Sequence, residues 1–248
     1  MRRFENKVVL LTGAGSGIGQ ATALRLDQEG ATLIIADINS QNLEQTRKML
    51  TNTNSSSMVL DISSIEDSKR CFADIKKSYK KLDALINVAG ILRFDNSHEV
   101  KIENWNKILE VNLTGTFFMC NYGIPMLLES KGYIVNVSST AALGSHAWTA
   151  AYSASKGGIS AFSKTLAVEY GFKGLNVNCV CPASIETPMS TNPDLPKDID
   201  TRLLKKIMPA DGVNRSPNDI ASTIAFLASE DAIHINGIDL RVDGGLLT

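Results

Sequence analysis

Residues 8–19 read Val8-Val9-Leu10-Leu11-Thr12-Gly13-Ala14-Gly15-Ser16-Gly17-Ile18-Gly19. The apolar residues at the start of this stretch predict a short buried strand, and the four glycines that follow predict a tight turn. The helix expected from Ile18 onward presents free N–H groups and the positive end of its dipole to an anion. Glycines also serve in ordinary turns, yet the order strand, glycine turn and helix is typical of a pyrophosphate-binding site.

The same alternation of strand and helix continues along the chain. We predict strands in short runs rich in Val, Ile and Leu, at 7–12, 31–38, 57–62, 82–88, 133–138, 175–180 and 238–242. We predict helices in the segments of helical period between them, at 18–29, 41–50, 65–80, 104–129, 152–172 and 217–229, with Ser40 and Ser216 as N-caps. The apolar runs lack polar alternation, which is typical of parallel strands buried on both faces.

This pattern predicts one α/β domain over residues 1–248, a doubly wound, seven-stranded parallel sheet with helices on both faces. The segment at 187–212 interrupts the rhythm and contains four of the seven prolines. We interpret it as a substrate-binding loop, because it follows a strand end. The alternative is an irregular surface excursion.

Composition excludes several classes of protein. The 248 residues carry a formal net charge of −1, so we expect neither a nucleic-acid nor a membrane partner. No apolar run approaches the roughly 18 residues of a spanning helix, and the N-terminus does not resemble a signal peptide, so we expect a cytoplasmic protein. The four scattered cysteines predict no disulfide framework, and Cys179-x-Cys181 lacks a second ligand pair, so we expect no metal site.

Asp37 ends the second predicted strand, eighteen residues after Gly19. A carboxylate at this distance from the glycine turn accepts hydrogen bonds from the adenosine ribose hydroxyls and repels a 2′-phosphate. The neighbouring Ser16 and Ile38 supply no cation for such a phosphate. We therefore predict NAD as the cofactor, with NADP less favoured. The alternative is that Asp37 only caps a helix or lies in a loop.

Tyr152 and Lys156 are four residues apart on one face of a predicted helix. A nearby ammonium favours the phenolate and lowers the pKa of a tyrosine toward the neutral range. Ser139 follows the fifth predicted strand, at the end where open α/β sheets bind ligands. A structural tyrosine beside a solvated lysine is the alternative interpretation of the pair alone.

These motifs resemble the classical short-chain dehydrogenase/reductase family along essentially the whole chain, and the resemblance implies a Rossmann fold. Asn87-Val88-Ala89-Gly90 is similar to the family's Asn-Asn-Ala-Gly motif, and Val242-Asp243-Gly244-Gly245 to its last strand and turn. The resemblance implies cofactor contacts from the following residues: Gly13, Ser16, Gly17, Ile18, Gly19, Asp37, Asp61, Ile62, Asn87, Ala89, Gly90, Tyr152, Lys156, Pro182, Ile185 and Thr187.

The resemblance also implies a catalytic tetrad of Asn112, Ser139, Tyr152 and Lys156 that serves hydride transfer between a nicotinamide cofactor and a secondary alcohol or ketone. Tyr152 would exchange the proton with the substrate oxygen, and Ser139 would hold that oxygen. Lys156 would lower the pKa of Tyr152 and bind the nicotinamide ribose, and Asn112 would hold a relay water. Taken alone, Asn112 inside a helix could instead bond only to backbone.

Two residues depart from the family pattern. Val88 replaces an asparagine, and Ala183 replaces the glycine after Pro182, which predicts a stiffer or slightly displaced nicotinamide loop. We expect activity to survive both changes.

The substrate side is expected at 91–94, 141–148 and 189–212, with a mostly apolar lining near the reacting carbon. Phe94 and Trp148 are candidate lining residues. Arg93 and His146 are candidates for a substrate carboxylate, although Arg93 in a solvated loop is an equal alternative.

Two alternative functions stay open. A 3-oxoacyl-acyl-carrier-protein reductase would use NADPH, and a nucleotide-sensing module would bind cofactor without chemistry. The resemblance further implies a homotetramer, or a homodimer, that pairs the helices at 104–129 and 152–172.

Overall fold

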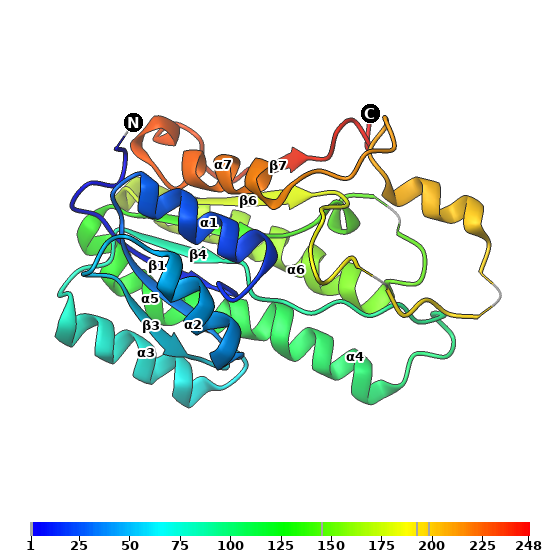
Figure 1. The fold of residues 1–248 in the computed structure, drawn as a ribbon, viewed down its shortest axis with the longest axis horizontal. Helices are drawn as coiled ribbons and strands as arrows, with labels where there is room; N and C mark the ends of the chain where they lie inside the picture. The colour runs from blue at the N-terminus through cyan, green and yellow to red at the C-terminus, as the bar shows by residue number, and fades with distance from the viewer. Residues whose placement is uncertain (1, 145, 192, 198) are drawn as a thin grey trace.

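The computed structural model describes residues 2–144, 146–191, 193–197 and 199–248 (Figure 1). Ser145, Asn192 and Asp198, which belong to the predicted substrate side, lie outside the described residues. The described chain forms a seven-stranded sheet in the order β3-β2-β1-β4-β5-β6-β7, in which every neighbouring pair is parallel. The strands are β1 (Val8–Thr12), β2 (Thr32–Asp37), β3 (Ser56–Val59), β4 (Ala84–Asn87), β5 (Tyr133–Val137), β6 (Asn176–Pro182) and β7 (Asp239–Val242).

Helices cover both faces of this sheet (Figure 1). The α-helices are α1 (Gly17–Gln28), α2 (Ser40–Met49), α3 (Ile65–Ser78), α4 (Ile102–Ile108), α5 (Thr116–Ser130), α6 (Ala150–Tyr170) and α7 (Pro217–Leu227). Helices α1, α2 and α7 pack on one face, and α3, α5 and α6 on the other. The predicted doubly wound fold is therefore confirmed.

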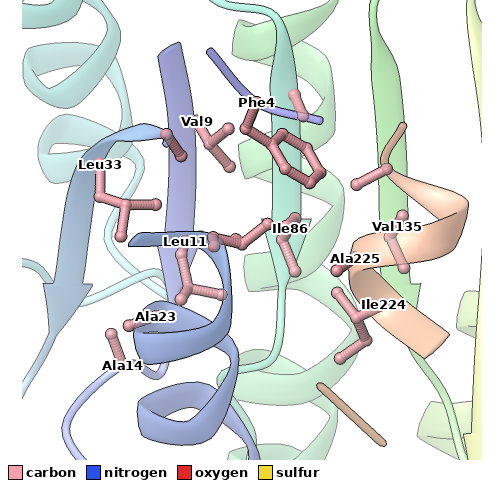
Figure 2. Close-up of a cluster of buried hydrophobic side chains, with 14 of the residues drawn as sticks. Phe4, Val9, Leu11, Ala14, Ala23, Leu33, Ile86, Val135, Ile224 and Ala225 are labelled. Atoms are coloured by element: carbon pink, nitrogen blue, oxygen red, sulfur yellow. The ribbon is translucent and has the colours of Figure 1, made fainter. Parts of the chain in front are cut away.

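Strand β1 lies between β2 and β4 and contributes side chains to both layers of the core, because successive residues of a strand point to opposite faces of the sheet. Val9 and Leu11 pack on the face covered by α1 and α7, as Figure 2 shows. Val8 and Leu10 pack on the face covered by α3 and α5. Both clusters consist of buried hydrophobic side chains, so the sheet is packed from two sides and its strand ends are held in place.

The prediction that every strand is buried on both faces is wrong for β3, which lies at the edge of the sheet. Strand β3 hydrogen-bonds to β2, and its outward residues Ser57 and Val59 are exposed, Val59 by 55%. An edge strand covered on one face alternates in burial, which a four-residue run of mixed composition does not reveal.

The prediction that Ser40 caps α2 is also wrong. The side chain of Asn39, not Ser40, accepts the capping hydrogen bond, from the backbone N–H of Asn42. Ser40 instead occupies the first turn. The predicted cap at Ser216 is confirmed, since its side chain accepts a hydrogen bond from the backbone N–H of Asn218.

The helix predicted at 104–129 consists of three consecutive parts. Between α4 and α5 the chain forms a π-helical segment, η1 (Leu109–Gly115), which contains Asn112. A π turn holds an extra residue, re-aims the side chains that follow and is common at functional sites. Helical period alone predicts one regular helix and not this change of pitch.

The chain reverses direction across the sheet between β1 and β4. From β1 it proceeds outward through β2 to β3, and then crosses back to β4 and onward to β7. Ligands of open α/β sheets bind in the crevice beyond the carboxyl ends of the strands at such a point. None of the described helices has the length and apolar character needed to span a bilayer.

Candidate active site

A cleft of about 590 Å³ opens at the carboxyl ends of the strands, at the reversal between β1 and β4. Fifteen of the residues predicted for the cofactor line it, together with the catalytic candidate Ser139. These fifteen are Gly13, Ser16, Gly17, Ile18, Gly19, Asp37, Asp61, Ile62, Ala89, Gly90, Tyr152, Lys156, Pro182, Ile185 and Thr187. Residues from seven separate segments of the chain thus meet in one cavity.

The glycine turn has the close packing that a dinucleotide site requires. A Cβ atom on Gly19 would lie 1.9 Å from the carbonyl oxygen of Gly13, and one on Gly13 would lie 2.6 Å from the backbone nitrogen of Ala89. Gly13 also has a φ of +70°, which favours glycine. Helix α1 starts at Gly17, and its N-cap Ser16 makes no side-chain capping bond. The described turn therefore leaves its N-terminal N–H groups available to phosphate oxygens.

Asp37 is placed at the far end of this turn. One carboxylate oxygen accepts a hydrogen bond from the backbone N–H of Gly15 at 2.8 Å, and the other from the backbone N–H of Asn39 at 2.8 Å. Each oxygen keeps a further lone pair for a hydroxyl group. Ile38, beside it, is 67% exposed and also lines the cleft. The position suits a ribose diol.

The reacting groups gather at the other end of the cleft. Lys156 is buried, its Nζ donates a hydrogen bond to the carbonyl of Val137 at 2.7 Å and lies 5.7 Å from the centre of the Tyr152 ring. Ser139 follows β5, and its hydroxyl accepts a hydrogen bond from the backbone N–H of Ala141 at 3.1 Å. The sheet and α6 thus bring an acid–base candidate, a hydroxyl and a cation to one place.

The electrostatics correct one expectation. Burial raises the pKa of Tyr152 above its ordinary value, and the hydrogen bond with Ser139 opposes part of that rise. Burial also lowers the pKa of Lys156 to about 8, which reduces the ammonium's ability to stabilise a phenolate. The pKa of Tyr152 is therefore raised and not lowered in this structure, because burial is the largest influence on it.

Asn112 holds the loop that follows β4. Its Oδ1 accepts a hydrogen bond from the backbone N–H of Ile91 at 2.8 Å, and its Nδ2 donates to the carbonyl of Ile91 at 2.9 Å and to Ser155 Oγ at 3.1 Å. The amide is fully buried. It therefore clamps a distant loop to helix α6 instead of bonding only to its own helix, and it does not line the cleft surface.

Asn87 is the one predicted cofactor residue whose side chain the structure turns away from the cleft. Its Nδ2 donates to Asn136 Oδ1 at 2.8 Å, and Asn136 in turn donates to Ser163 Oγ at 2.8 Å. Asn87 is 3% exposed. Its place at the end of β4 suggested a cofactor contact, yet the pleat points its side chain into the layer beneath α6.

Some of the residues predicted for the substrate side line the cleft. Phe94, His146, Met189 and Ile207 line the cleft with Ser139 and Tyr152. Trp148 lines a second cavity of about 440 Å³ that also touches His146. Trp148 has a φ of +64°, a left-handed conformation that is rare for a bulky side chain.

Arg93 is paired with a carboxylate of the protein itself. Its Nε donates to both carboxylate oxygens of Asp95, at 3.0 and 2.9 Å, and its side chain is 48% exposed. It is not among the residues that line the described cleft. The solvated-loop alternative is thus the better description of Arg93.

Some lining residues lacked a sequence signal of their own. Leu60 and Val111 directly precede the motif residues Asp61 and Asn112, and Asn39 and Asn42 follow Asp37. Their positions next to recognised residues were the only available clue, because apolar and amide side chains are common everywhere.

Ala183 and the cysteines behave as ordinary structural residues. Positive φ occurs at four described residues other than glycine, and Ala183 is not one of them, so alanine fits this loop without backbone strain. Burial raises the pKa of Cys179 to about 12 and that of Cys181 to about 11. Among the described residues, no group of three His, Cys, Asp or Glu side chains is placed to hold a metal ion.

Comparison with known proteins identifies the family. A family model described as enoyl-(acyl carrier protein) reductase matches residues 13–247. The chain is 33% identical to meso-2,3-butanediol dehydrogenase of Serratia marcescens, over 98% of this chain and 95% of the relative. It is 36% identical to 3-oxoacyl-(acyl-carrier-protein) reductase of Thermotoga maritima, over 99% of each chain.

A solved structure of 3-ketoacyl-(acyl-carrier-protein) reductase from Brucella melitensis, complexed with NADH, aligns with a TM-score of 0.90. The two chains are 31% identical, and the alignment covers 98% of this chain and 99% of that one. The chain belongs to the short-chain dehydrogenase/reductase family, as its motifs indicate.

The clamp made by Asn112 leads to a stability prediction. Asn112→Ala leaves the N–H and C=O of Ile91 without protein partners, so the free energy of unfolding should fall by about 2–4 kcal/mol. The exposed Asn106 of α4 offers a matched control, and Asn106→Ala should change the free energy of unfolding by less than about 0.5 kcal/mol. Urea unfolding followed by circular dichroism measures both. Equal effects of the two substitutions would contradict the clamp.

Proposed function

We propose that this protein is an NAD-dependent oxidoreductase that transfers hydride between the nicotinamide cofactor and a secondary alcohol or its ketone. The observation that carries the proposal is the placement of Tyr152, Ser139 and Lys156 at one end of the cleft whose other end is the glycine turn. A dinucleotide spans such a distance, and its nicotinamide would then lie beside the three side chains. The relatives include a meso-2,3-butanediol dehydrogenase and a 3-oxoacyl-(acyl-carrier-protein) reductase, which supports the reaction class and leaves the substrate to be tested.

Each residue has a defined task in this proposal. The cofactor, when bound, supplies or accepts the hydride. Ser139 donates a hydrogen bond to the substrate oxygen and holds the reacting carbon in position. Tyr152 gives its proton to that oxygen in reduction and takes it back in oxidation. Lys156 holds the nicotinamide ribose, and Asn112 orders the loop through Ile91 and the proposed proton-relay water near Lys156.

The protonation states favour the reductive role at neutral pH. Because burial raises the pKa of Tyr152, its phenol is protonated and ready to donate. Oxidation needs the phenolate, which forms in growing amounts as the pH rises toward that pKa. Lys156, with a pKa of about 8, can exchange its own proton with solvent near neutrality, which suits a relay.

Tyr152→Phe tests the proton-transfer role. The substitution should abolish turnover while the affinity for NADH stays within about threefold of wild type, because the phenol oxygen is needed for chemistry more than for cofactor binding. In the wild type, kcat/KM for oxidation should rise from about pH 6 to about pH 9, whereas kcat/KM for reduction should not. Wild-type turnover in the variant, or a flat oxidation profile, would show that another group transfers the proton.

NAD is proposed over NADP because of Asp37. Its carboxylate would repel a 2′-phosphate, and the described cleft is lined by Lys107 and Lys156 but by no arginine. The hydrogen bond from Gly15 fixes the carboxylate in this place. The NADPH-dependent acyl-carrier reductase is the second candidate, favoured only by relatives of that name.

A cofactor titration separates these candidates. Wild type should bind NADH much more tightly than NADPH when nicotinamide fluorescence is followed. Asp37→Ala with Ile38→Arg should reverse the order, and Asp37→Asn, which keeps an acceptor for Gly15, should by itself raise the relative NADPH affinity at least about tenfold. Tighter NADPH binding by the wild type would favour the acyl-carrier reductase. Binding of either cofactor without turnover of any alcohol or ketone would favour a nucleotide-sensing module.

We also propose that the protein assembles as a homotetramer through α5 and α6. Phe117 on α5, Val168 on α6 and Phe172 in the turn directly after α6 are 44%, 84% and 81% exposed, more apolar surface than a monomer needs there. Light scattering at micromolar concentration should give about four times the 26.8 kDa mass of one chain. A homodimer remains the lesser alternative, and a monomer would refute the assembly. A cytoplasmic location stays a prediction.

A further inference from the structure

His146 lies on the substrate side, and the proposed reaction does not yet use it. Its half-buried ring lines the cleft that contains Ser139 and Tyr152, and it also lines the neighbouring cavity of about 440 Å³. The ring therefore forms the boundary between the reacting centre and the space next to it.

The hydrogen bonds around Thr140 determine which nitrogen of the ring carries a proton. Thr140 follows Ser139, and its buried hydroxyl lies 3.2 Å from the carbonyl oxygen of Pro182 and 3.3 Å from Nε2 of His146. We assign the single hydroxyl proton to the bond with Pro182, because a carbonyl oxygen can only accept whereas an imidazole nitrogen can also donate. With this assignment the hydroxyl oxygen accepts from Nε2 of His146.

The other nitrogen, Nδ1, is consequently a hydrogen-bond acceptor. Burial lowers the pKa of His146 below its ordinary value, so the imidazole is neutral near pH 7 and carries one proton, the one on Nε2. No side chain or backbone group of the described residues donates a hydrogen bond to Nδ1. With this tautomer, Nδ1 carries a lone pair on a residue that lines both cavities.

We propose that Nδ1 of His146 accepts a hydrogen bond from a second hydroxyl group of the substrate and so selects diols and hydroxyketones over simple alcohols and ketones. The inference rests on the proposed function, because it assumes that Ser139 and Tyr152 engage the reacting oxygen. The second oxygen then lies next to the ring, on the carbon chain beyond the reacting carbon. Leu92, Phe94 and Met189 give the cleft wall apolar surface as well.

The same assignment favours a hydroxyl over a carboxylate as the group that His146 would bind. A neutral ring that presents a lone pair repels an anion and attracts a hydroxyl proton. Arg93, the other candidate for a carboxylate, is paired with Asp95. The substrate side of the described cleft therefore suits an uncharged, hydroxylated molecule.

Two substitutions of His146 distinguish the loss of the hydrogen-bond acceptor from the loss of the ring itself. His146→Gln keeps a donor at the ε position for Thr140 but has no acceptor at the δ position. His146→Asn keeps an oxygen acceptor at the δ position but cannot reach Thr140. The readout is the ratio of kcat/KM for butane-2,3-diol to that for butan-2-ol, which differ only in the second hydroxyl. NAD-linked oxidation is followed by NADH absorbance.

The wild-type ratio should exceed about ten. His146→Gln should lower the ratio about three- to tenfold, which corresponds to one lost hydrogen bond between neutral groups, while His146→Asn should retain most of it. A wild-type ratio near one, an unchanged ratio in His146→Gln, or equal losses in both variants would overturn the inference. Failure to turn over either alcohol while NADH binds would instead refute the proposed function itself, together with this inference.

Discussion

The rest of the site depends on the close approach of Gly13 and Gly19. The turn after β1 folds so tightly that no side-chain atom fits between the start of α1 and the end of the strand. Gly13 also packs closely against Ala89, which follows β4, since a Cβ atom on Gly13 would lie 2.6 Å from the backbone nitrogen of Ala89. The two strands on either side of the chain reversal are thereby held together at their carboxyl ends. Every other cleft residue is positioned relative to this contact through the register of the sheet.

A buried polar network aligns the reacting side chains with that frame. Asn87 on β4 bonds to Asn136 on β5, which bonds to Ser163 on α6. Nearer the cleft, Ser138 Oγ donates to the carbonyl of Lys156 at 2.9 Å. The helix that carries Tyr152 and Lys156 is thus tied directionally to the strand that leads to Ser139, whereas aliphatic packing alone would let the helix slide. Precise placement of an acid–base group needs this kind of support.

The sequence predicted the features that depend on local chemistry. The glycine turn, Asp37 and the i, i+4 spacing of Tyr152 and Lys156 all lie in the cleft. The features it missed depend on three-dimensional context. The side chain of Asn87 points away from the cleft because of the strand's pleat, and Asn112 lies in a π turn that helical period cannot reveal. The pKa of Tyr152 is governed by burial, which a spacing of residues does not contain.

Trp148 has a different significance. Glycine would adopt this left-handed backbone conformation with little strain, yet the residue here is a tryptophan whose side chain lines the second cavity. The carbonyl of Trp148 accepts a hydrogen bond from the backbone N–H of Asp95, and this bond fastens the strained segment to the loop after β4. None of these groups exchanges a proton with the substrate oxygen. The segment is therefore a natural place for redesign, where the range of accepted molecules can be altered while the reacting groups keep their positions.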